Sequence, residues 1–431
     1  MLIEKYNEKQ KKAVEVLETG YDIFLTEKTE TGKKKLINGI ELNAEQKTAI
    51  MLILQGKNVC LLGSAGTGKT ATIQEACKIL TKMGKQVKKV SLYGLAAQLV
   101  GGITIHSAFN IPLKLKGFIP SKQNVRRIGC TDVLIVDEIS IVNKSMFDII
   151  GKCLSFYEGK MQIVVVGDFY QLEPICNGDN SEFAFESDYW KILNFSVCIL
   201  KKIVRQDNPE YISNLQKVRV GDKSSFRYFM THMNRHWMED AIAICTHCQD
   251  ADEINERKIS ALIGNESKVY CANYEGEIDK NLLQGEKTLT IKTGMRVMTT
   301  LNSNEGYQNG SMGEVVGFDE DNISVRFDYD GQIHKIGWVR VKMNRTDRDE
   351  TTDVVFMPLR PAYAITIHKS QGQTFDKVNI VIGQRKVFAH GQLYVALTRC
   401  RSIENTHIKG NLCGCKIEPN PKVLAFYNRM A

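Results

Sequence analysis

Short apolar runs, separated by longer stretches of mixed character, dominate the hydrophobic pattern between residues 42 and 200. The clearest of these runs are NVCLL at 58–62, VLIV at 133–136 and QIVVV at 162–166. The stretch ATIQEACKILTKM, which begins at Ala71, has the spacing of polar and apolar residues that is typical of a helix. Buried strands that alternate with helices predict a parallel sheet with helices on both faces.

A second region of the same kind begins near Ile199, with a helical stretch at 208–220 and the run AIAIC at 241–245. From about 285 to 343 the chain changes to short alternating runs interrupted by Gly, Asn and Asp, which predicts a small antiparallel β-barrel. The predicted fold class is therefore α/β, with two parallel-sheet domains and a small β-barrel inserted in the second. The first domain is predicted at 41–200, with a small insertion at about 105–128. The second domain is predicted at 201–284 and 344–431, and the barrel at 285–343.

Length and composition fit this organisation. The chain has 431 residues, which at roughly 150 residues per domain allows two to three domains or one large domain with insertions. Hydrophobic residues make up 43% and charged residues 25%, values that exclude wholesale disorder, a coiled-coil rod and a collagen-like chain. The formal net charge of +8 is a mild basic bias, compatible with a polyanion partner and also with an ordinary solvated surface.

No apolar run approaches the roughly 20 residues of a membrane-spanning helix, and the first residues, MLIEKYNEKQ, lack the apolar core of a secretory signal. Most of the 12 cysteines stand singly in apolar stretches, as reduced cysteines do in intracellular proteins. The two closer pairs, Cys245 with Cys248 and Cys413 with Cys415, lie far apart in the sequence, so a zinc site is not expected. We expect a soluble intracellular protein with no membrane partner; the pattern leaves cytoplasm and nucleus open.

The segment GSAGTGKT lies between the first apolar run and the helical stretch that follows it. Its glycines let backbone N–H groups approach phosphate oxygens, and the positive end of the following helix favours an anion. Strand, glycine-rich loop and helix together are the context of a phosphate-binding loop. We expect nucleotide contacts from Gly63, Ser64, Ala65, Gly66, Thr67, Gly68, Lys69 and Thr70. Lys69 would reach the β- and γ-phosphates, and the Thr70 hydroxyl would bind Mg²⁺.

The first residues of the chain repeat this region in a degenerate form. Residues 7–37 align without a gap on residues 43–73. The positions that match in order are Asn7, Gln10, Lys11, Ala13, Gly20, Leu25, Thr31, Gly32 and Lys33. The first copy lacks what phosphate binding needs, with Glu27 in place of Gly63, Glu30 in place of Gly66 and Lys34 in place of Thr70. We therefore predict that residues 1–40 are a poorly anchored duplicate in which Lys33 binds no nucleotide.

Asp137 and Glu138 directly follow the strand VLIV. A carboxylate at the carboxyl end of a neighbouring strand is well placed to hold Mg²⁺, the role we expect of Asp137. The adjacent Glu138 can polarise an attacking water molecule. Together with the loop, this pair predicts a P-loop NTPase but does not indicate what the energy of hydrolysis is used for.

The substrate is suggested by a series of segments in a fixed order: LNAEQKTAI, GSAGTGKT, GGITIHSAF, LIVDEIS, VVVGDFYQLEPI, LKKIVRQ, ITIHKSQGQTFDKV and GQLYVALTRCRS. With these segments the chain resembles, over residues 42–410, the DNA helicases of superfamily 1, class B, specifically the Pif-type members, with the RecD-type as cousins. The resemblance implies two RecA-like domains that use ATP and Mg²⁺ to move 5′ to 3′ on single-stranded DNA. It also implies unwinding of tailed duplex DNA, and we expect a monomer.

The resemblance assigns further residues to nucleotide chemistry. Gln46 matches the glutamine that reads the adenine edge, and Gln171 matches the sensor that couples the γ-phosphate to the DNA groove. Arg205 in VRQ and Arg399 in ALTR match the two arginines of the second domain that reach the γ-phosphate. A guanidinium there neutralises charge on the transferring phosphoryl group and makes hydrolysis depend on domain closure. The expected catalytic residues are thus Lys69, Glu138, Gln171, Arg205 and Arg399.

On the DNA side, the motifs TIHS and HKSQG match segments that line the DNA groove. Their short polar side chains suit phosphate contacts that do not read the base sequence. The expected contacts are Thr104, His106, Ser107, His368, Lys369, Ser370 and Gln371. Phe109, Phe169 and Tyr170 are candidates for stacking on bases, and each of them could equally belong to the hydrophobic core.

The chain departs from the family pattern at a few positions. Tyr93 replaces a usual Thr, Glu173 replaces a usual Pro, and Pro361 and Tyr363 stand where Leu and Trp are usual. These changes bear on DNA affinity and step coupling rather than on ATP hydrolysis. Two other hypotheses stay open: an ATP-dependent nucleic-acid switch or clamp with little unwinding, and a P-loop ATPase unrelated to nucleic acid. The second is disfavoured by HKSQG and YVALTR, which an isolated nucleotide-binding domain would not need.

Overall fold

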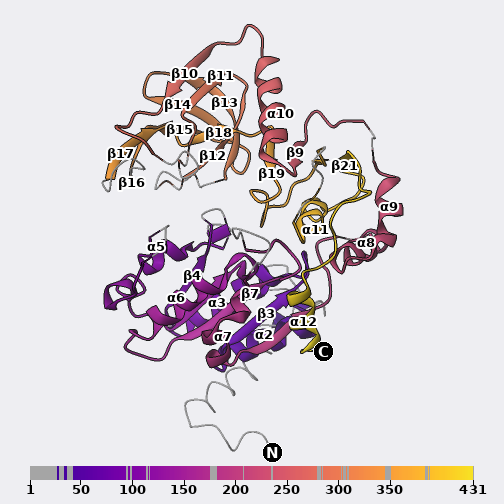
Figure 1. The fold of residues 1–431 in the computed structure, drawn as a ribbon. Coiled ribbons are helices and arrows are strands. Elements are labelled where there is room, and N and C mark those ends of the chain that lie inside the picture. Colours follow the sequence, from indigo (N-terminus) through magenta and orange to yellow (C-terminus); the bar gives the residue numbers. More distant parts are fainter. Residues whose placement is uncertain are drawn as a thin grey trace, which may run out of the picture.

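The computed structural model of the chain describes residues 27–28, 34–35 and 42–430, with short gaps in the last range. These gaps are 94–95, 98–99, 113–114, 116, 175–181, 207, 234–235, 279–282, 284, 302, 304–306, 308–309, 345–350, 384–386 and 388. Two parallel sheets and a group of antiparallel strands make up the described part (Figure 1). The predicted duplicate at 1–40 lies outside the described residues, except for β1 (Glu27–Lys28) and β2 (Lys34–Lys35), which pair antiparallel.

The first sheet has six parallel strands in the order β5-β4-β6-β7-β3-β8. Its strands are β3 (Val59–Gly63), β4 (Val87–Ser91), β5 (Ile103–Thr104), β6 (Val133–Asp137), β7 (Gln162–Gly167) and β8 (Ser196–Leu200). Alternate residues of β3 enter different hydrophobic clusters, Cys60 and Leu62 on one face and Val59 and Leu61 on the other. Both faces are therefore buried, as the uninterrupted apolar runs predict.

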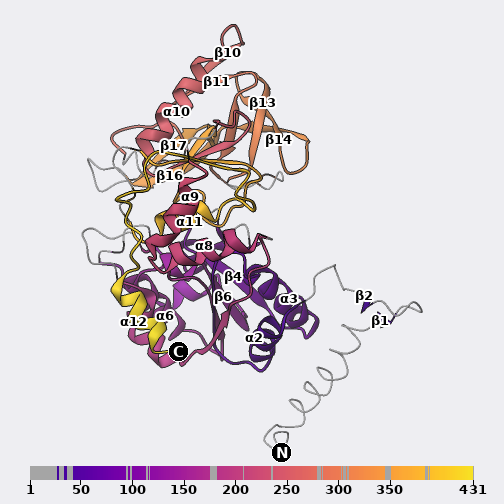
Figure 2. The same cartoon turned by 90° about the vertical axis from the view of Figure 1, so that its right-hand side faces the viewer.

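Helices cover both faces of the first sheet. One face carries α2 (Ala44–Leu54) and α3 (Lys69–Lys82), and the other carries α5 (Ile105–Phe109), α6 (Lys144–Leu154) and α7 (Asp188–Leu193). The last helix, α12 (Pro421–Asn428), lies beside α6 (Figure 2), and its Val423 and Phe426 pack in the cluster that also contains side chains of α6 and α7. The end of the chain thus returns to the first sheet, which differs from the assignment of all of 344–431 to the second domain. Among the described residues, no helix has the length and apolar character that crossing a membrane requires.

The second sheet has four parallel strands in the order β19-β9-β20-β21. These strands are β9 (Ile242–Cys245), β19 (Ala364–Thr366), β20 (Val378–Val381) and β21 (Thr406–Lys409). One face packs against α8 (Pro209–Arg219), α9 (Phe226–Met230) and α11 (Gln392–Leu397), and the other against α10 (Cys248–Ser260). The predicted helix at 208–220 is confirmed, and its start is fixed by Asn208, whose side chain accepts a hydrogen bond from the Tyr211 N–H.

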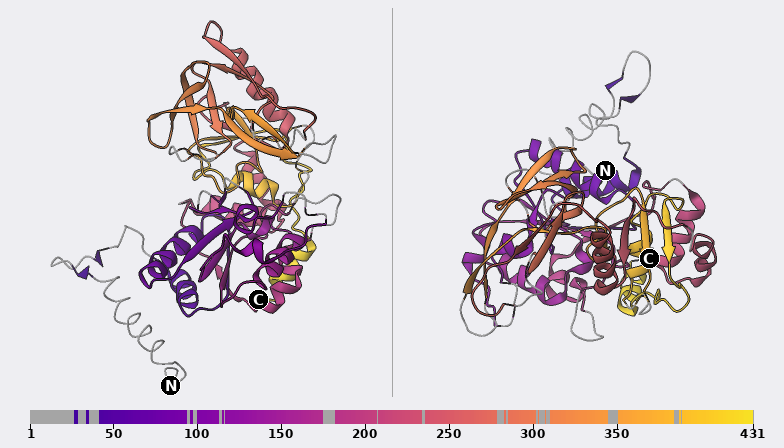
Figure 3. Two further views of the ribbon diagram at one scale, coloured as in Figure 1. Left: turned by 90° about the vertical axis from the view of Figure 1, so that its left-hand side faces the viewer. Right: turned by 90° about the horizontal axis from the view of Figure 1, so that it is seen from above.

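Antiparallel strands lie at the opposite end of the molecule from the first sheet (Figure 3). They are β10 (Ser267–Cys271), β11 (Thr288–Lys292), β12 (Arg296–Thr299), β13 (Met312–Phe318), β14 (Asn322–Phe327), β15 (Ile333–Gly337), β16 (Val339–Asn344), β17 (Thr351–Phe356) and β18 (Leu359–Pro361). A five-stranded sheet, β15-β14-β13-β12-β18, accompanies the pairs β10-β11 and β16-β17. The strands extend beyond the predicted 285–343, and hydrogen bonds among those described do not close a barrel.

Candidate nucleotide and DNA site

The predicted phosphate-binding loop connects β3 to α3. Gly66 and Gly68 have φ values of 83° and 84°, in the left-handed region that glycine adopts without strain. Gly66 also allows a close approach, because a Cβ there would lie 2.7 Å from the Arg205 Cβ. The Val204 N–H donates to the Gly66 carbonyl oxygen at 2.8 Å. The loop therefore packs directly against the segment that leads from the first sheet to the second.

Lys69 begins α3 and folds its side chain back over the loop. Its Nζ donates to the carbonyl oxygens of Gly63 at 2.7 Å and Ser64 at 3.1 Å. Burial lowers the pKa of Lys69, and nearby carboxylates, chiefly that of Asp168, act in the opposite direction. The Thr70 hydroxyl lies exposed in the first turn of the same helix. Positive charge and backbone N–H groups thus meet where a phosphate would bind.

Asp137 ends β6, and its Oδ1 accepts a hydrogen bond from the Glu138 N–H at 2.9 Å. Burial and the adjacent Glu138 raise the pKa of Asp137. Glu138 has a φ of 51°, a left-handed value that is uncommon outside glycine and that recurs at functional sites. In this conformation its Oε2 accepts a hydrogen bond from Gln371 Nε2 at 3.2 Å. This bond joins the acidic pair of the first sheet to the segment that follows β19.

A cavity of about 370 Å³ lies where these elements meet, a volume in the range of small-molecule sites. Its walls include Ala65, Gly66, Gly68, Lys69, Thr70, Asp137, Glu138, Gln171, Val204, Arg205, Gly372 and Arg399. Thr70 and Asp137 contribute a hydroxyl and a carboxylate, the hard oxygen ligands that Mg²⁺ prefers, so the residues present fit that ion. The cavity thus combines a phosphate-binding loop, acidic groups and two arginines.

The two arginines reach the cavity from beyond the first sheet. Arg399 is 2% exposed, and backbone carbonyls hold its guanidinium: Val395 at 2.9 Å, Ser370 at 3.2 Å and Gln373 at 3.0 Å. Burial and the neighbouring Arg205 lower the pKa of Arg399 to about 10. Burial also lowers the pKa of Arg205. A buried and a half-buried guanidinium that repel each other would be stabilised by an anion between them.

Gln46 lies against the phosphate-binding loop. Its Nε2 donates to the Thr67 carbonyl oxygen at 3.4 Å, and its Oε1 accepts a hydrogen bond from the Asn43 N–H at 2.9 Å. The second bond completes a capping box at the start of α2. A side chain at Gly68 would collide with the Gln46 amide. Gln171 is buried after β7 and lines the same cavity.

One contact that sequence reasoning missed joins the loop to the second sheet. Tyr394 in α11 is 2% exposed, and its hydroxyl accepts a hydrogen bond from the Ala65 N–H at 2.9 Å. Burial raises the pKa of Tyr394, so the hydroxyl stays neutral. The residue belongs to YVALTR, a motif in which the family resemblance implies a role only for Arg399. The motif therefore predicts that this segment contributes to the nucleotide site, but it does not indicate that Tyr394 contacts the loop.

Five of the predicted DNA contacts lie in two segments at the ends of parallel strands. Thr104 and Ser107 stand at the start of α5, where Thr104 Oγ1 accepts a hydrogen bond from the Ser107 N–H at 3.1 Å. Lys369 is exposed after β19, and His106 and His368 are half-buried. Burial lowers the pKa of both histidines, which favours their neutral form. One segment belongs to the first sheet and the other to the second.

Four other residues predicted for the DNA surface are buried in this structure. Ser370 is 0% exposed, and its hydroxyl donates to the Ile367 carbonyl oxygen at 2.8 Å. Gln371 is 5% exposed, and its amide is turned to the nucleotide cavity through its bond to the acidic pair. Phe109 and Phe169 are 0% and 2% exposed inside the hydrophobic core of the first sheet. All four side chains point into the packing: Phe109 and Phe169 belong to the hydrophobic core, the alternative that the sequence left open, and DNA contact by Ser370 and Gln371 stays a prediction.

Comparisons with known proteins show the family of the chain. The PIF1-like helicase family matches residues 41–233, and the UvrD-like helicase C-terminal domain matches residues 361–402. The ATP-dependent DNA helicase Pif1 of Psychrobacter sp. is 30% identical to this chain, and the similarity covers 87% of this chain and 69% of that protein. The chain belongs to the PIF1-like helicase family.

Two further members of the family are similar over most of this chain. The human ATP-dependent DNA helicase PIF1 is 30% identical over 416 residues, which cover 90% of this chain and 63% of that protein. The chain therefore spans about two thirds of the length of these curated relatives. The crystal structure of Pif1 helicase from Bacteroides in complex with ADP-AlF3 and ssDNA superposes with a TM-score of 0.77 at 29% identity. That similarity covers 91% of this chain and 97% of the Bacteroides chain.

Proposed function

We propose that the protein is a DNA helicase that hydrolyses ATP in the cavity between its two parallel sheets. The observation that carries the proposal is that one cavity combines Lys69 and Glu138 of the first sheet with Arg399, which follows α11. The bond from Gln371 to Glu138 joins the two halves. Hydrolysis in a cavity shared by two bodies can drive their relative movement. The names of the human and Psychrobacter relatives support the same activity.

Each residue of the cavity has a chemical role that its position supports. Lys69 neutralises charge on the β- and γ-phosphates, and Glu138 polarises the attacking water. Arg205 and Arg399 stabilise the negative charge that spreads over the transferring phosphoryl group. Thr70 and Asp137 would hold Mg²⁺, which would supply positive charge to the phosphate oxygens. Gln371 orients the Glu138 carboxylate through its amide.

Single-stranded DNA would lie across both sheets and contact their outward polar segments. The candidate contacts are Thr104, His106 and Ser107 on the first sheet and His368 and Lys369 on the second. Because the two groups belong to different sheets, movement of one sheet against the other would move the strand. The Bacteroides Pif1 structure, bound to ssDNA, supports this class of partner. We take the direction as 5′ to 3′ from the family resemblance.

Strand displacement from tailed duplex DNA tests the proposal. With ATP and Mg²⁺, the purified protein should displace the strand from a duplex with a 5′ single-stranded tail and not from one with a 3′ tail. A non-hydrolysable ATP analogue is the matched control and should give no displacement. DNA-stimulated hydrolysis without displacement would instead favour a nucleic-acid switch. Displacement from the 3′-tailed substrate alone would overturn the direction but not the helicase activity.

A further inference from the structure

A buried ion pair ties the turn that carries Gln171 to the second sheet. Asp168, which begins this turn after β7, is 0% exposed. Arg219, the last residue of α8, donates to it from Nη2 at 2.7 Å and from Nε at 3.1 Å. Burial alone would lower the pKa of Arg219, but Asp168 raises it overall, so the guanidinium stays charged. Because α8 packs on the second sheet through Leu215 and Val218, the pair spans both bodies.

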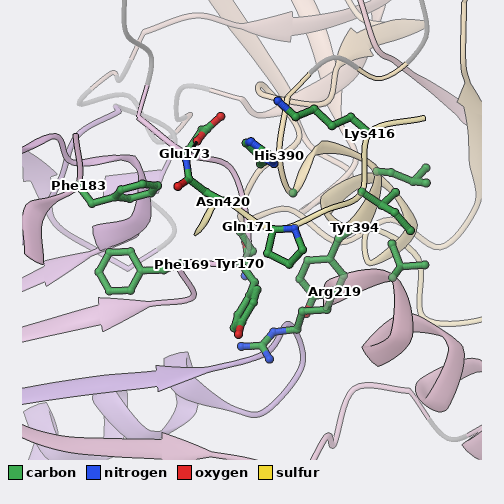
Figure 4. Close-up of a pocket in the computed structure, with 15 residues that line it drawn as sticks. Phe169, Tyr170, Gln171, Glu173, Phe183, Arg219, His390, Tyr394, Lys416 and Asn420 are labelled. Carbon is green, nitrogen blue, oxygen red and sulfur yellow. Dashed lines mark hydrogen bonds between the residues drawn. The ribbon is translucent and has the colours of Figure 1, made fainter. Parts of the chain in front are cut away.

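The Asp168 carboxylate also shapes the turn itself. The Tyr170 N–H donates to its Oδ1 at 3.2 Å, and the Gln171 N–H donates to the Asp168 backbone carbonyl at 2.9 Å. Figure 4 places Tyr170, Gln171 and Arg219 around one small cavity at this junction. Gln171 lines the nucleotide cavity as well. A displacement of the carboxylate would therefore displace Gln171.

The C-terminal helix completes this arrangement. The Tyr427 hydroxyl of α12 donates to Asp168 Oδ1 at 3.3 Å, and its ring stacks on Tyr170 with centroids 4.6 Å apart. The Arg219 guanidinium lies 4.2 Å from the Tyr170 ring centroid and 5.7 Å from that of Tyr427. A planar guanidinium that is held by a carboxylate and two aromatic rings has a defined orientation as well as a charge.

The segment before α12 crosses from one sheet to the other at the same turn. Cys415 and Ile417 pack in the hydrophobic cluster of the second sheet, whereas Phe426 packs in that of the first. Between them, Asn420 Nδ2 donates to Glu173 Oε2 at 3.0 Å. Glu173 is one of the positions at which this chain departs from the family pattern. The chain end thus contacts the 168–173 turn through both Asn420 and Tyr427 and bridges the two bodies.

We propose that Arg219 and Tyr427 are positioning residues that hold Asp168, and through it Gln171, so that DNA binding is coupled to ATP hydrolysis. Neither residue is on the wall of the nucleotide cavity, so each acts through Asp168 rather than on the phosphates. The two hydrogen bonds between Arg219 and Asp168 fix one orientation of the 168–173 turn relative to α8. A lysine could not form both bonds in this planar geometry. The inference rests on the proposed function, because it assigns a coupling device to the same site.

Two mild substitutions test the coupling in the full-length protein. Arg219→Lys keeps the charge but loses the planar fork, and Tyr427→Phe removes only the hydroxyl. Arg219→Lys should lower the DNA-stimulated kcat by about tenfold, less than the ~10²-fold that a 1 Å misplacement at a catalytic site can cost. Tyr427→Phe should lower it by about threefold, and neither should change the DNA-free kcat or the KM for ATP by more than about twofold. Tyr157→Phe is the matched control, because its hydroxyl donates to the Thr131 carbonyl away from the turn.

The double variant separates coupling from a structural role. Because both residues act through Asp168, the two substitutions together should lower the stimulated kcat no further than Arg219→Lys alone. If the effects of the two substitutions on the stimulated kcat multiply in the double variant, the inference is overturned. It is also overturned if the variants unfold at a lower temperature while DNA stimulation stays intact. If Arg219→Lys does not fold, an unchanged stimulated kcat in Tyr427→Phe would still overturn it. A wild-type protein without DNA stimulation would instead contradict the proposed function, so the two failures are distinguishable.

Discussion

At the residue scale, the point charge of Lys69 is the part of the cavity with the clearest expected consequence. Lys69→Ala should abolish ATP hydrolysis and unwinding, because the β- and γ-phosphates lose their counter-charge. Single-stranded DNA binding should largely survive, since Thr104 and Lys369 lie outside the nucleotide cavity. A coupled ATPase assay tests the loss of hydrolysis, and fluorescence anisotropy tests whether DNA binding survives. Near-normal turnover in this variant would contradict the assignment of the loop.

The arginines have a different expected signature from the lysine. Arg399→Ala and Arg205→Ala should each lower kcat far more than they raise the KM for ATP, because the charge that they neutralise develops in the transition state. Arginine fingers in related enzymes are worth ~10³–10⁵ in rate. Arg401→Ala is the matched control, since this nearby arginine is exposed and does not line the cavity. A kcat within about threefold of wild type for either variant would remove that residue from the mechanism.

The sequence identifies some functional side chains better than others for a physical reason. Lys69 and Glu138 stand at fixed offsets from a strand end, so the backbone alone decides where they lie. Ser370 and Gln371 lie in an irregular segment, where motif membership does not say which way a side chain points. Gln371 meets its partner Glu138 across 233 positions of sequence, and no local pattern encodes such a contact. The same limit applies to Phe109, which periodicity alone does not distinguish from a surface ring.

At the element scale, the apolar runs predict the central strands β3, β6 and β7 to within a residue or two. Their residues are buried on both faces, so the pattern has no ambiguity of register. The sequence did not predict where α12 packs. This helix has eight residues and buries Val423 and Phe426, which would suit either sheet. The sheet against which α12 packs depends on the path of residues 411–420 along the second sheet, and that path is a property of the assembled fold.

The N-terminal duplicate provides the prediction at this scale. Deleting residues 1–40 should leave DNA-stimulated ATPase intact, because Glu27 and Glu30 would crowd and repel phosphates in any loop formed there. Deleting residues 1–46 should also raise the KM for ATP, through loss of Gln46. Steady-state kinetics of both truncations test these two expectations. Lys33→Ala is an additional variant, and its kinetics should match those of wild type.

The capping box at the start of α2 calls for its own control in that experiment. Gln46 supports the helix as well as the loop, and the deletion of 1–46 also removes Asn43, an N-cap residue worth about 1 kcal/mol of stability. Asn43→Ala removes the cap and keeps Gln46, and should leave the KM near that of wild type. An inactive or unfolded protein after deletion of 1–40, or impaired turnover in Lys33→Ala, would show that the duplicate has acquired a role of its own.

At the scale of the whole molecule, the nucleotide cavity and the candidate DNA contacts depend on how two sheets meet. The strands β3, β6 and β7 of the first sheet and β9 of the second are predictable from their own apolar runs. The relation between the two sheets is not, because it depends on buried cross-contacts such as Tyr394 with Ala65 and Arg219 with Asp168. These contacts join residues separated by 329 and 51 positions. The polar groups involved are buried in pairs, as the cost of burying either one alone requires.

The same relation between the sheets leads to a prediction about DNA. Strand binding that engages both sheets should stimulate ATP hydrolysis strongly, because it favours the closed cavity. Binding through phosphates should weaken with salt, at a log–log slope of about −0.7 per phosphate contact on a single strand. Lys369→Ala should make that slope shallower by about one such contact, whereas Lys69→Ala should leave it unchanged. Anisotropy titrations with an oligothymidine at several salt concentrations measure the slopes. An ATPase that is indifferent to DNA at low salt would favour the hypothesis of a P-loop ATPase unrelated to nucleic acid.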